Sequence, residues 1–314
     1  MRTTHKTTQY WYVALKVLLL VLAFGYIVYK IKTERMDVLH LFSNRMATVP
    51  IGALAAFVGI ATLNWMLEIY KWKIAANTWF QLSTRQALQQ CLGAMTASLL
   101  TPNRIGEYGA KALYFDPNDR KKVVFLNFVH SSSQMLATLL FGLPALLYFS
   151  YSHSVALAPS RFIIFSAAVL LLLVLGYTYR KKQLGLKGFS LENLALKFRK
   201  IPTQRKIYIL ALSMARYIVF SYLFFILLQF FGVALAPVHA AIYIFTMYLL
   251  VSILPSFFVL DVVIRGGVAV WLFSYAGVSE IAVLATVFFM WLLNTVVPAL
   301  LGSYFVLTFK PKSA

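Results

Sequence analysis

Six apolar runs of about 20 residues or more constrain this chain more than any other feature. Each is long enough to cross a hydrocarbon core of about 30 Å, where a single segment satisfies its backbone hydrogen bonds only as a helix. The composition agrees, since 61% of the 314 residues are apolar and 12% are charged. We therefore predict an all-α polytopic membrane protein. The six full spans are expected at about residues 10–29, 49–69, 123–150, 161–179, 207–231 and 281–307.

Two further apolar stretches, 86–115 and 239–275, are interrupted by prolines and charges. Their central parts read SLLTPNRIGEYGAKA and SILPSFFVLDVVIRGGVA. In each, an apolar run meets a proline, an acid follows five or six residues later, and a base follows four residues after the acid. These positions are Pro102, Glu107 and Lys111 in the first stretch, and Pro255, Asp261 and Arg265 in the second. We predict that both stretches are broken-helix hairpins; two complete crossings each remain the open alternative.

The order span, hairpin, span occurs twice, at about 49–150 and 207–307, with the two hairpins opening to opposite sides. This arrangement is typical of secondary transporters with inverted repeats and broken helices. We expect a single transmembrane domain over residues 1–314, with a basic cytoplasmic loop at 180–206.

The basic residues predict the orientation. With 29 Lys and Arg against 9 Asp and Glu, the net charge is +20. On the six-span layout one face receives 19 of the basic residues and the other receives four or five. The positive-inside rule then places both termini in the cytoplasm, and the basic loop lies against anionic headgroups. The positive charge is therefore interpreted as topology, and we expect no nucleic acid partner.

Ionisable side chains at membrane depth are costly and face partners or a water-filled cavity. Glu107 with Lys111, and Asp261 with Arg265, have the spacing of ion pairs on one helix face. Arg216 has no local counter-ion, so we predict that it faces an anion. The half-helix after Thr101 would add the positive end of its dipole. The seven charged candidates are Glu68, Arg104, Glu107, Lys111, Arg216, Asp261 and Arg265.

Other polar residues have more than one interpretation. His130 is a proton relay, a headgroup ligand or a hydrogen-bonding partner of neighbouring helices, and residues 131–134 either bridge helices or line a cavity. Glu68 and its neighbours, Asn64, Trp65, Lys71, Trp72 and Lys73, have the pattern of an interfacial belt with an internal salt link. Asn294 is expected to hydrogen-bond another helix, and Cys91, the only cysteine, to be a core residue. The sequence contains no zinc motif, P-loop or nucleophile elbow, and we expect no metal and no cofactor.

The string LLTPNRIGEYGAKA resembles the Thr-Pro-x-x-x-Gly-Glu signature of the lysylphosphatidylglycerol synthase transmembrane region, with matches at Thr101, Pro102, Gly106 and Glu107. The resemblance implies a flippase-like protein of the bacterial inner (plasma) membrane that moves lipids or lipid-linked molecules between leaflets. Members often carry Pro-Gly-Gly and Glu in the second repeat, whereas here Pro255 precedes Ser256-Phe257-Phe258 and the acid is Asp261. The chain ends at Ala314 without the soluble aminoacyltransferase domain, so we do not expect it to aminoacylate lipid.

The leading hypothesis is a lipid flippase or flippase-like transporter for an anionic phospholipid or lipid-linked molecule. Arg104, Arg216 and Arg265 would receive the anion, while Glu107 and Asp261 would orient them. We expect no catalytic residue. The alternatives are an intramembrane enzyme acting on a lipid phosphate, with Glu107 or His130 as general base, and a membrane subunit whose basic loop recruits a separate lipid-modifying enzyme. The predicted substrate-binding residues are Thr101, Pro102, Arg104, Gly106, Glu107, Lys111, His130, Arg216, Asp261 and Arg265.

Overall fold

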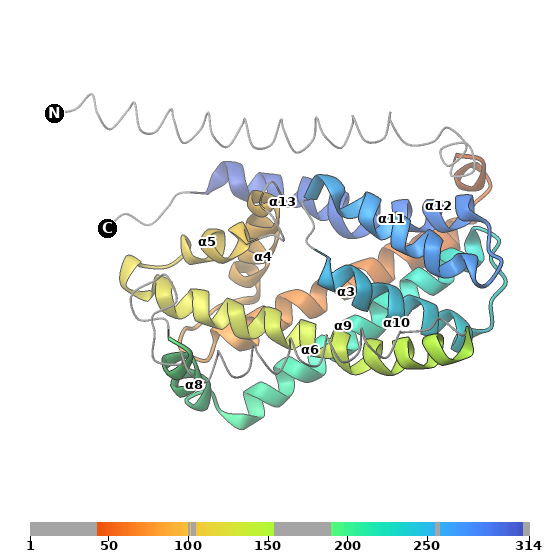
Figure 1. The fold of residues 1–314 in the computed structure, drawn as a ribbon. Coiled ribbons are helices and arrows are strands. Elements are labelled where there is room, and N and C mark those ends of the chain that lie inside the picture. Colours follow the sequence, from red (N-terminus) through yellow and green to blue (C-terminus); the bar gives the residue numbers. More distant parts are fainter. Residues whose placement is uncertain (1–42, 100, 102–104, 154–189, 255–257, 310–314) are drawn as a thin grey trace.

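The described part of the chain is helical, as predicted (Figure 1). A computed structural model describes residues 43–99, 101, 105–153, 190–254 and 258–309, with side chains from residue 262 onward in the last range. No strand occurs among these residues.

Four of the described helices are long and apolar enough to cross a membrane. They are α3 (Ile51–Ala76), α6 (Arg120–Ser152, preceded by the 3-10 turn η2, Pro117–Asp119), α9 (Thr203–Phe230), and the continuous run of α12 (Glu280–Trp291), η3 (Leu292–Val296) and α13 (Val297–Thr308). They coincide with four of the predicted spans, those at 49–69, 123–150, 207–231 and 281–307. The predicted spans at 10–29 and 161–179 lie outside the described residues.

Both proline-containing stretches consist of two shorter helices. The first contains α4 (Thr84–Ser98) and α5 (Gly106–Ala112), and the second contains α10 (Pro237–Ile253) and α11 (Phe258–Ser274). Each first helix ends shortly before the proline, because the proline ring disfavours helical backbone at the preceding residue. At 1.5 Å per residue the seven residues of α5 extend about 10 Å, much less than a bilayer core. The predicted breaks are thus confirmed.

The basic loop contains one described helix, α8 (Leu191–Arg199). Ser190 is its N-cap residue, and the Ser190 hydroxyl accepts a hydrogen bond from the Asn193 amide. Lys197 and Arg199 lie in the last turn of α8. These charges complement the helix dipole. Leu191, Leu196 and Phe198 are exposed.

Helices far apart in sequence form the main contacts. α3 packs on α9, α4 packs on α13, and α6 packs on α10. Two of these pairs approach closely at a glycine. A Cβ atom on Gly142 of α6 would lie 2.7 Å from Leu249 Cβ and 3.2 Å from the Phe245 carbonyl oxygen of α10. A Cβ atom on Gly302 of α13 would likewise meet Thr96 and the Leu92 carbonyl of α4.

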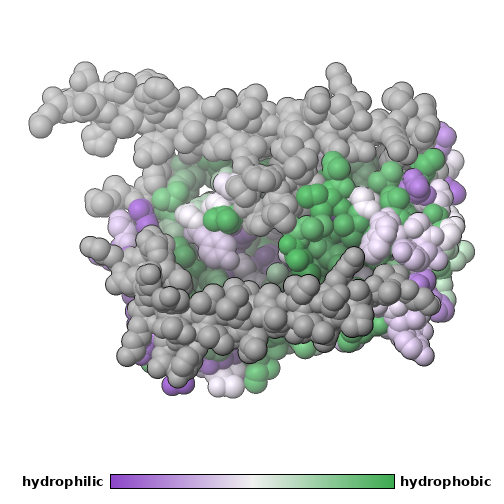
Figure 2. All heavy atoms as spheres, viewed as in Figure 1, coloured by the Kyte–Doolittle hydropathy of each residue, from purple (hydrophilic) through white to green (hydrophobic). Residues whose placement is uncertain are grey.

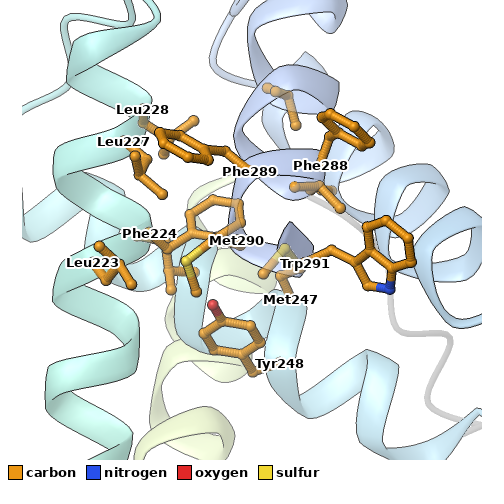
Figure 3. Close-up of a cluster of buried hydrophobic side chains, with 14 of the residues drawn as sticks. Leu223, Phe224, Leu227, Leu228, Met247, Tyr248, Phe288, Phe289, Met290 and Trp291 are labelled. Carbon is orange, nitrogen blue, oxygen red and sulfur yellow. The ribbon is translucent and has the colours of Figure 1, made fainter. Parts of the chain in front are cut away.

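The largest core cluster joins α9, α10 and α12 (Figure 3). Phe224 of α9, Met247 and Tyr248 of α10, and Met290 of α12 gather in this view, whereas the Trp291 ring of α12 points to one side. In the space-filling view, hydrophobic residues gather over the region of α11 (Figure 2).

The last span contains one turn of π-helix, η3, just before Pro298. A proline inside a helix has no amide hydrogen and clashes with the carbonyl four residues earlier, and an extra residue in the turn relieves that clash. Asn294 lies in this turn, and its side-chain oxygen accepts a 2.9 Å hydrogen bond from Asn64 of α3. The predicted role of Asn294 in a helix-to-helix hydrogen bond is confirmed.

Candidate functional site

A cluster of buried charged and polar side chains joins α3, α6 and α9. Glu68 of α3 lies at its centre. Its Oε2 atom is 3.0 Å from Lys71 Nζ and 3.3 Å from Arg216 Nη1, and its Oε1 atom is 3.5 Å from His130 Nε2. The Lys71 side chain is 1% exposed, so its charge has been removed from solvent almost completely. A buried ammonium group is tolerated because the Glu68 carboxylate compensates its charge.

Gln134 of α6 connects the same two cations on their other side. Its side-chain oxygen accepts hydrogen bonds from Lys71 Nζ at 3.2 Å and from Arg216 Nη1 at 3.3 Å. Its amide nitrogen donates to the Ser213 carbonyl of α9. Ser133 also contacts Ser213, with the two hydroxyl oxygens 2.8 Å apart. One side chain therefore fixes the position of Arg216 relative to α6.

A second ion pair lies on α5. Lys111 Nζ is 2.7 Å from Glu107 Oε1 and donates a 2.9 Å hydrogen bond to the Asn127 side chain of α6. It also lies 4.4 Å from the centroid of the Trp72 ring, a cation–π distance. The Lys111 side chain is fully buried, so this pair anchors α5 to α3 and α6.

The two groups together contain one cation more than carboxylates. Lys71, Lys111 and Arg216 face Glu68 and Glu107 among the side chains that the structure describes here. Each cation contacts a carboxylate, but Lys71 and Arg216 share Glu68, so the two groups carry a formal excess of one positive charge.

A cavity of about 270 Å³ begins where this cluster ends. Arg216 lines it, which explains why this side chain is 23% exposed although it lies near the middle of α9. Arg265 of α11 also lines it, as do Asn64 and Trp65 of α3 and Gln134 of α6. Aromatic residues complete much of the remaining wall: Tyr217, Phe220, Phe224, Tyr248 and Trp291.

Residues in the cavity wall have unmet hydrogen-bonding capacity. The Nε1 atoms of Trp65 and Trp291, the Nε atom of Arg216, and the hydroxyl groups of Tyr217 and Tyr248 are buried without a hydrogen-bond partner in the described part of the chain. Indole and guanidinium nitrogens only donate, and tyrosine hydroxyls also donate. Buried donors are normally satisfied. Each of these atoms has almost no accessible surface, so none of them faces the open space of the cavity, and a ligand would reach them only if the side chains moved.

The predicted site residues separate into those in the cavity wall and those outside it. Arg216 and Arg265 line the cavity, whereas Glu107, Lys111 and His130 do not. Pro102 and Arg104 lie outside the described residues. Asp261 belongs to α11, but its side chain is not described, so the predicted pair with Arg265 stays a prediction. The predicted pair of Glu107 with Lys111 is confirmed.

Thr101 and Gly106 have a structural role at the start of α5. The Thr101 hydroxyl accepts a 2.9 Å hydrogen bond from the Gly106 amide and donates one of 2.7 Å to the Ser98 carbonyl. A Cβ atom on Gly106 would lie 2.8 Å from Thr101 Cγ2, so the glycine permits this close approach. The Thr-Pro-x-x-x-Gly part of the motif therefore joins α4 to α5. The predicted anion at this helix start stays a prediction.

Arg216, which has no local counter-ion, faces Glu68 on a different helix, a pairing that local spacing does not reveal. One sequence-based interpretation is wrong: the interfacial belt does not hold for Lys71 and Trp72, since both are buried against other helices. The internal salt link from Glu68 to Lys71 is confirmed.

His130 and Cys91 are both buried. The His130 ring packs edge-on against Trp72, with the centroids 5.7 Å apart, and its contact with Glu68 is electrostatic. No hydrogen bond from its ring to another described residue is present, so the predicted hydrogen bond to a neighbouring helix is not found. The core position predicted for Cys91 is confirmed.

Sequence reasoning identified Glu68 as a candidate, because it is an acid within an apolar helix, but missed most of the cavity wall. Trp65, Tyr217, Tyr248 and Trp291 gave no comparable signal, because 16% of the chain is aromatic and most of those residues pack in the core or face lipid.

Comparison with known proteins agrees with these observations. The chain matches none of the curated proteins or solved structures with which it was compared. It does match a protein family, the lysylphosphatidylglycerol synthase TM region, over residues 11–302, which is nearly its whole length. With its long apolar helices, this identifies a multi-pass membrane protein with a lipid-related role. The chain belongs to the family of the lysylphosphatidylglycerol synthase transmembrane region.

Proposed function

We propose that this protein moves an anionic phospholipid or lipid-linked molecule between the leaflets of the bacterial inner membrane. The observation that supports this most directly is the cavity with Arg216 and Arg265 in its wall. An arginine at membrane depth costs about 2.5 to 3.5 kcal/mol on insertion scales, and such residues mark substrate pathways. The two arginines, together with the one formal positive charge in excess in the adjoining cluster, favour an anionic headgroup.

The packing supports an inverted repeat, on which alternating access would depend. The first helix of each hairpin, α4 or α10, packs on the last span of the other half, α13 or α6. Each contact is made at a glycine of the last span, Gly302 or Gly142. These glycines face residues 92 and 96 in one half and 245 and 249 in the other, at equal spacing. We propose that the two halves are related by a pseudo-two-fold axis and that both hairpins are re-entrant.

We propose transport rather than catalysis. Glu107 is bound to Lys111 and is absent from the cavity wall, and His130 is buried away from it. A general base must reach the proton that it removes. Neither of the two residues considered as a base has access to a ligand in this cavity.

Transport of a fluorescent phosphatidylglycerol in reconstituted liposomes tests the proposal. The double variant Arg216→Gln, Arg265→Gln should reduce the rate by about tenfold or more, because the anion loses both charged partners. Arg199→Gln, which removes an exposed charge on α8, is the matched control and should transport normally. Transport by the double variant at the wild-type rate would overturn the proposal. Chemical conversion of the lipid in detergent, where leaflets are absent, would favour an enzyme.

A further inference from the structure

A second cavity of about 220 Å³ lies between α11 and α12. Its wall contains no charged residue among those described. The side facing α11 includes Val263, Gly266 and Gly267, and the side facing α12 includes Leu284, Val287 and Phe288. Val263 is 47% exposed, so this apolar groove opens to the surface of the protein.

The two adjacent glycines give the groove its depth. A Cβ atom on Gly266 would lie 3.0 Å from Leu284 Cδ2, so this glycine allows α12 to approach. A Cβ atom on Gly267 would meet no atom within 4 Å. Glycine inside a helix costs about 1 kcal/mol relative to alanine. Helix packing accounts for Gly266 but leaves the space beside Gly267 unused.

The groove adjoins the cavity that contains the arginines. Val287 of α12 lines both spaces. On α11, Arg265 lines the charged cavity and the next residue, Gly266, lines the groove. A space lined by two arginines and an apolar space thus lie side by side at these two helices. This pairing matches an amphiphile, which has one part of each kind.

We propose that the groove between α11 and α12 holds a hydrocarbon chain of the same anionic lipid whose headgroup occupies the cavity at Arg216 and Arg265. This inference rests on the proposed function and makes it more specific. Lipid tails are as apolar as the groove, so a bilayer offers the chain a comparable environment. The shape of the groove is therefore what matters. It fixes where the hydrocarbon chain lies while the headgroup is bound, and it selects a lipid over a free phosphate.

The test compares two probes on purified protein in detergent. The lipid probe is dioleoyl phosphatidylglycerol, and the headgroup probe is glycerol 3-phosphate. Gly267→Leu should weaken lipid binding by about tenfold, because its side chain fills the groove, and should leave glycerol 3-phosphate binding unchanged. Gly267→Ala should bind the lipid like the wild type, since space for a Cβ atom is present.

The controls separate this inference from the proposed function. Gly59→Leu on α3 is the matched control, because a Cβ atom there also meets nothing within 4 Å, and it should bind lipid normally. Val263→Phe, at the exposed rim of the groove, gives a second variant if Gly267→Leu fails to fold. If the groove variants bind the lipid as Gly59→Leu does, while Arg216→Gln, Arg265→Gln binds neither probe, the groove inference fails and the proposed function stands. If the wild type binds neither probe, both fail.

Discussion

Glu68 compensates buried positive charge on two helices. Its carboxylate faces Lys71 on its own helix and Arg216 on α9, and its other oxygen lies near His130 on α6. Removing one partner of a buried ion pair leaves the other charge uncompensated, which costs about 3 to 5 kcal/mol. An exposed pair is worth about 1 kcal/mol or less.

Glu68→Gln should therefore lower the thermal unfolding midpoint in detergent substantially. The change preserves size and removes the charge that Lys71 and Arg216 share. Asp119→Asn provides the comparison, because it breaks the pair with Lys122, whose side chain is 54% exposed. It should leave the midpoint almost unchanged. Equal midpoints for the two variants would show that the charges in the cluster are compensated by something other than Glu68.

Sequence spacing predicted part of this site. Glu107 and Lys111 lie four residues apart on one helix, so their pairing follows from helix geometry alone. The contact between Glu68 and Arg216 depends on how α3 packs against α9, which spacing does not encode. The sequence therefore indicated that Arg216 needs an anionic partner, but it could not identify Glu68 as that partner.

At the scale of helices, glycine contacts determine which elements lie together. Without a hydrophobic driving force between helices in lipid, close packing at small residues becomes important. Gly142 brings α6 against α10, and Gly302 brings α13 against α4. The apolar runs predicted the four long helices, because the thickness of a bilayer fixes their length. The same runs could not predict these pairings, since apolar residues lie on most sides of every span and do not indicate its neighbour.

Gly142→Leu should destabilise the protein in detergent by about 1 to 3 kcal/mol or more, the cost of overpacking. One of the atoms that the new side chain would meet is the Phe245 carbonyl oxygen, which belongs to the backbone and cannot rotate away. Gly302→Leu should have a similar effect on α4 and α13. A Cβ atom on Gly52 would meet nothing within 4 Å, so Gly52→Leu should unfold at the wild-type temperature. If Gly142→Leu also unfolds at that temperature, the close contact between α6 and α10 is not required for stability.

At the scale of the whole molecule, the basic residues have two different roles: some are expected to set the orientation in the membrane, and others belong to the candidate site. Most of the 29 basic residues lie in predicted loops, where their uneven distribution predicts that both termini are cytoplasmic. Four others matter for the site that the fold assembles: Lys71, Lys111, Arg216 and Arg265. The helices place the first three in ion pairs, and they place Arg216 and Arg265 in the wall of one cavity.

The most direct test of that cavity is the identity of the lipids that remain bound during purification. Wild-type protein and the double variant Arg216→Gln, Arg265→Gln would be prepared identically from the same membranes, and their lipids would be quantified by mass spectrometry. We predict that one class of anionic lipid is enriched over the bulk membrane in the wild type and that this enrichment disappears in the double variant. The same bulk lipid composition in both preparations would contradict a headgroup site at these arginines.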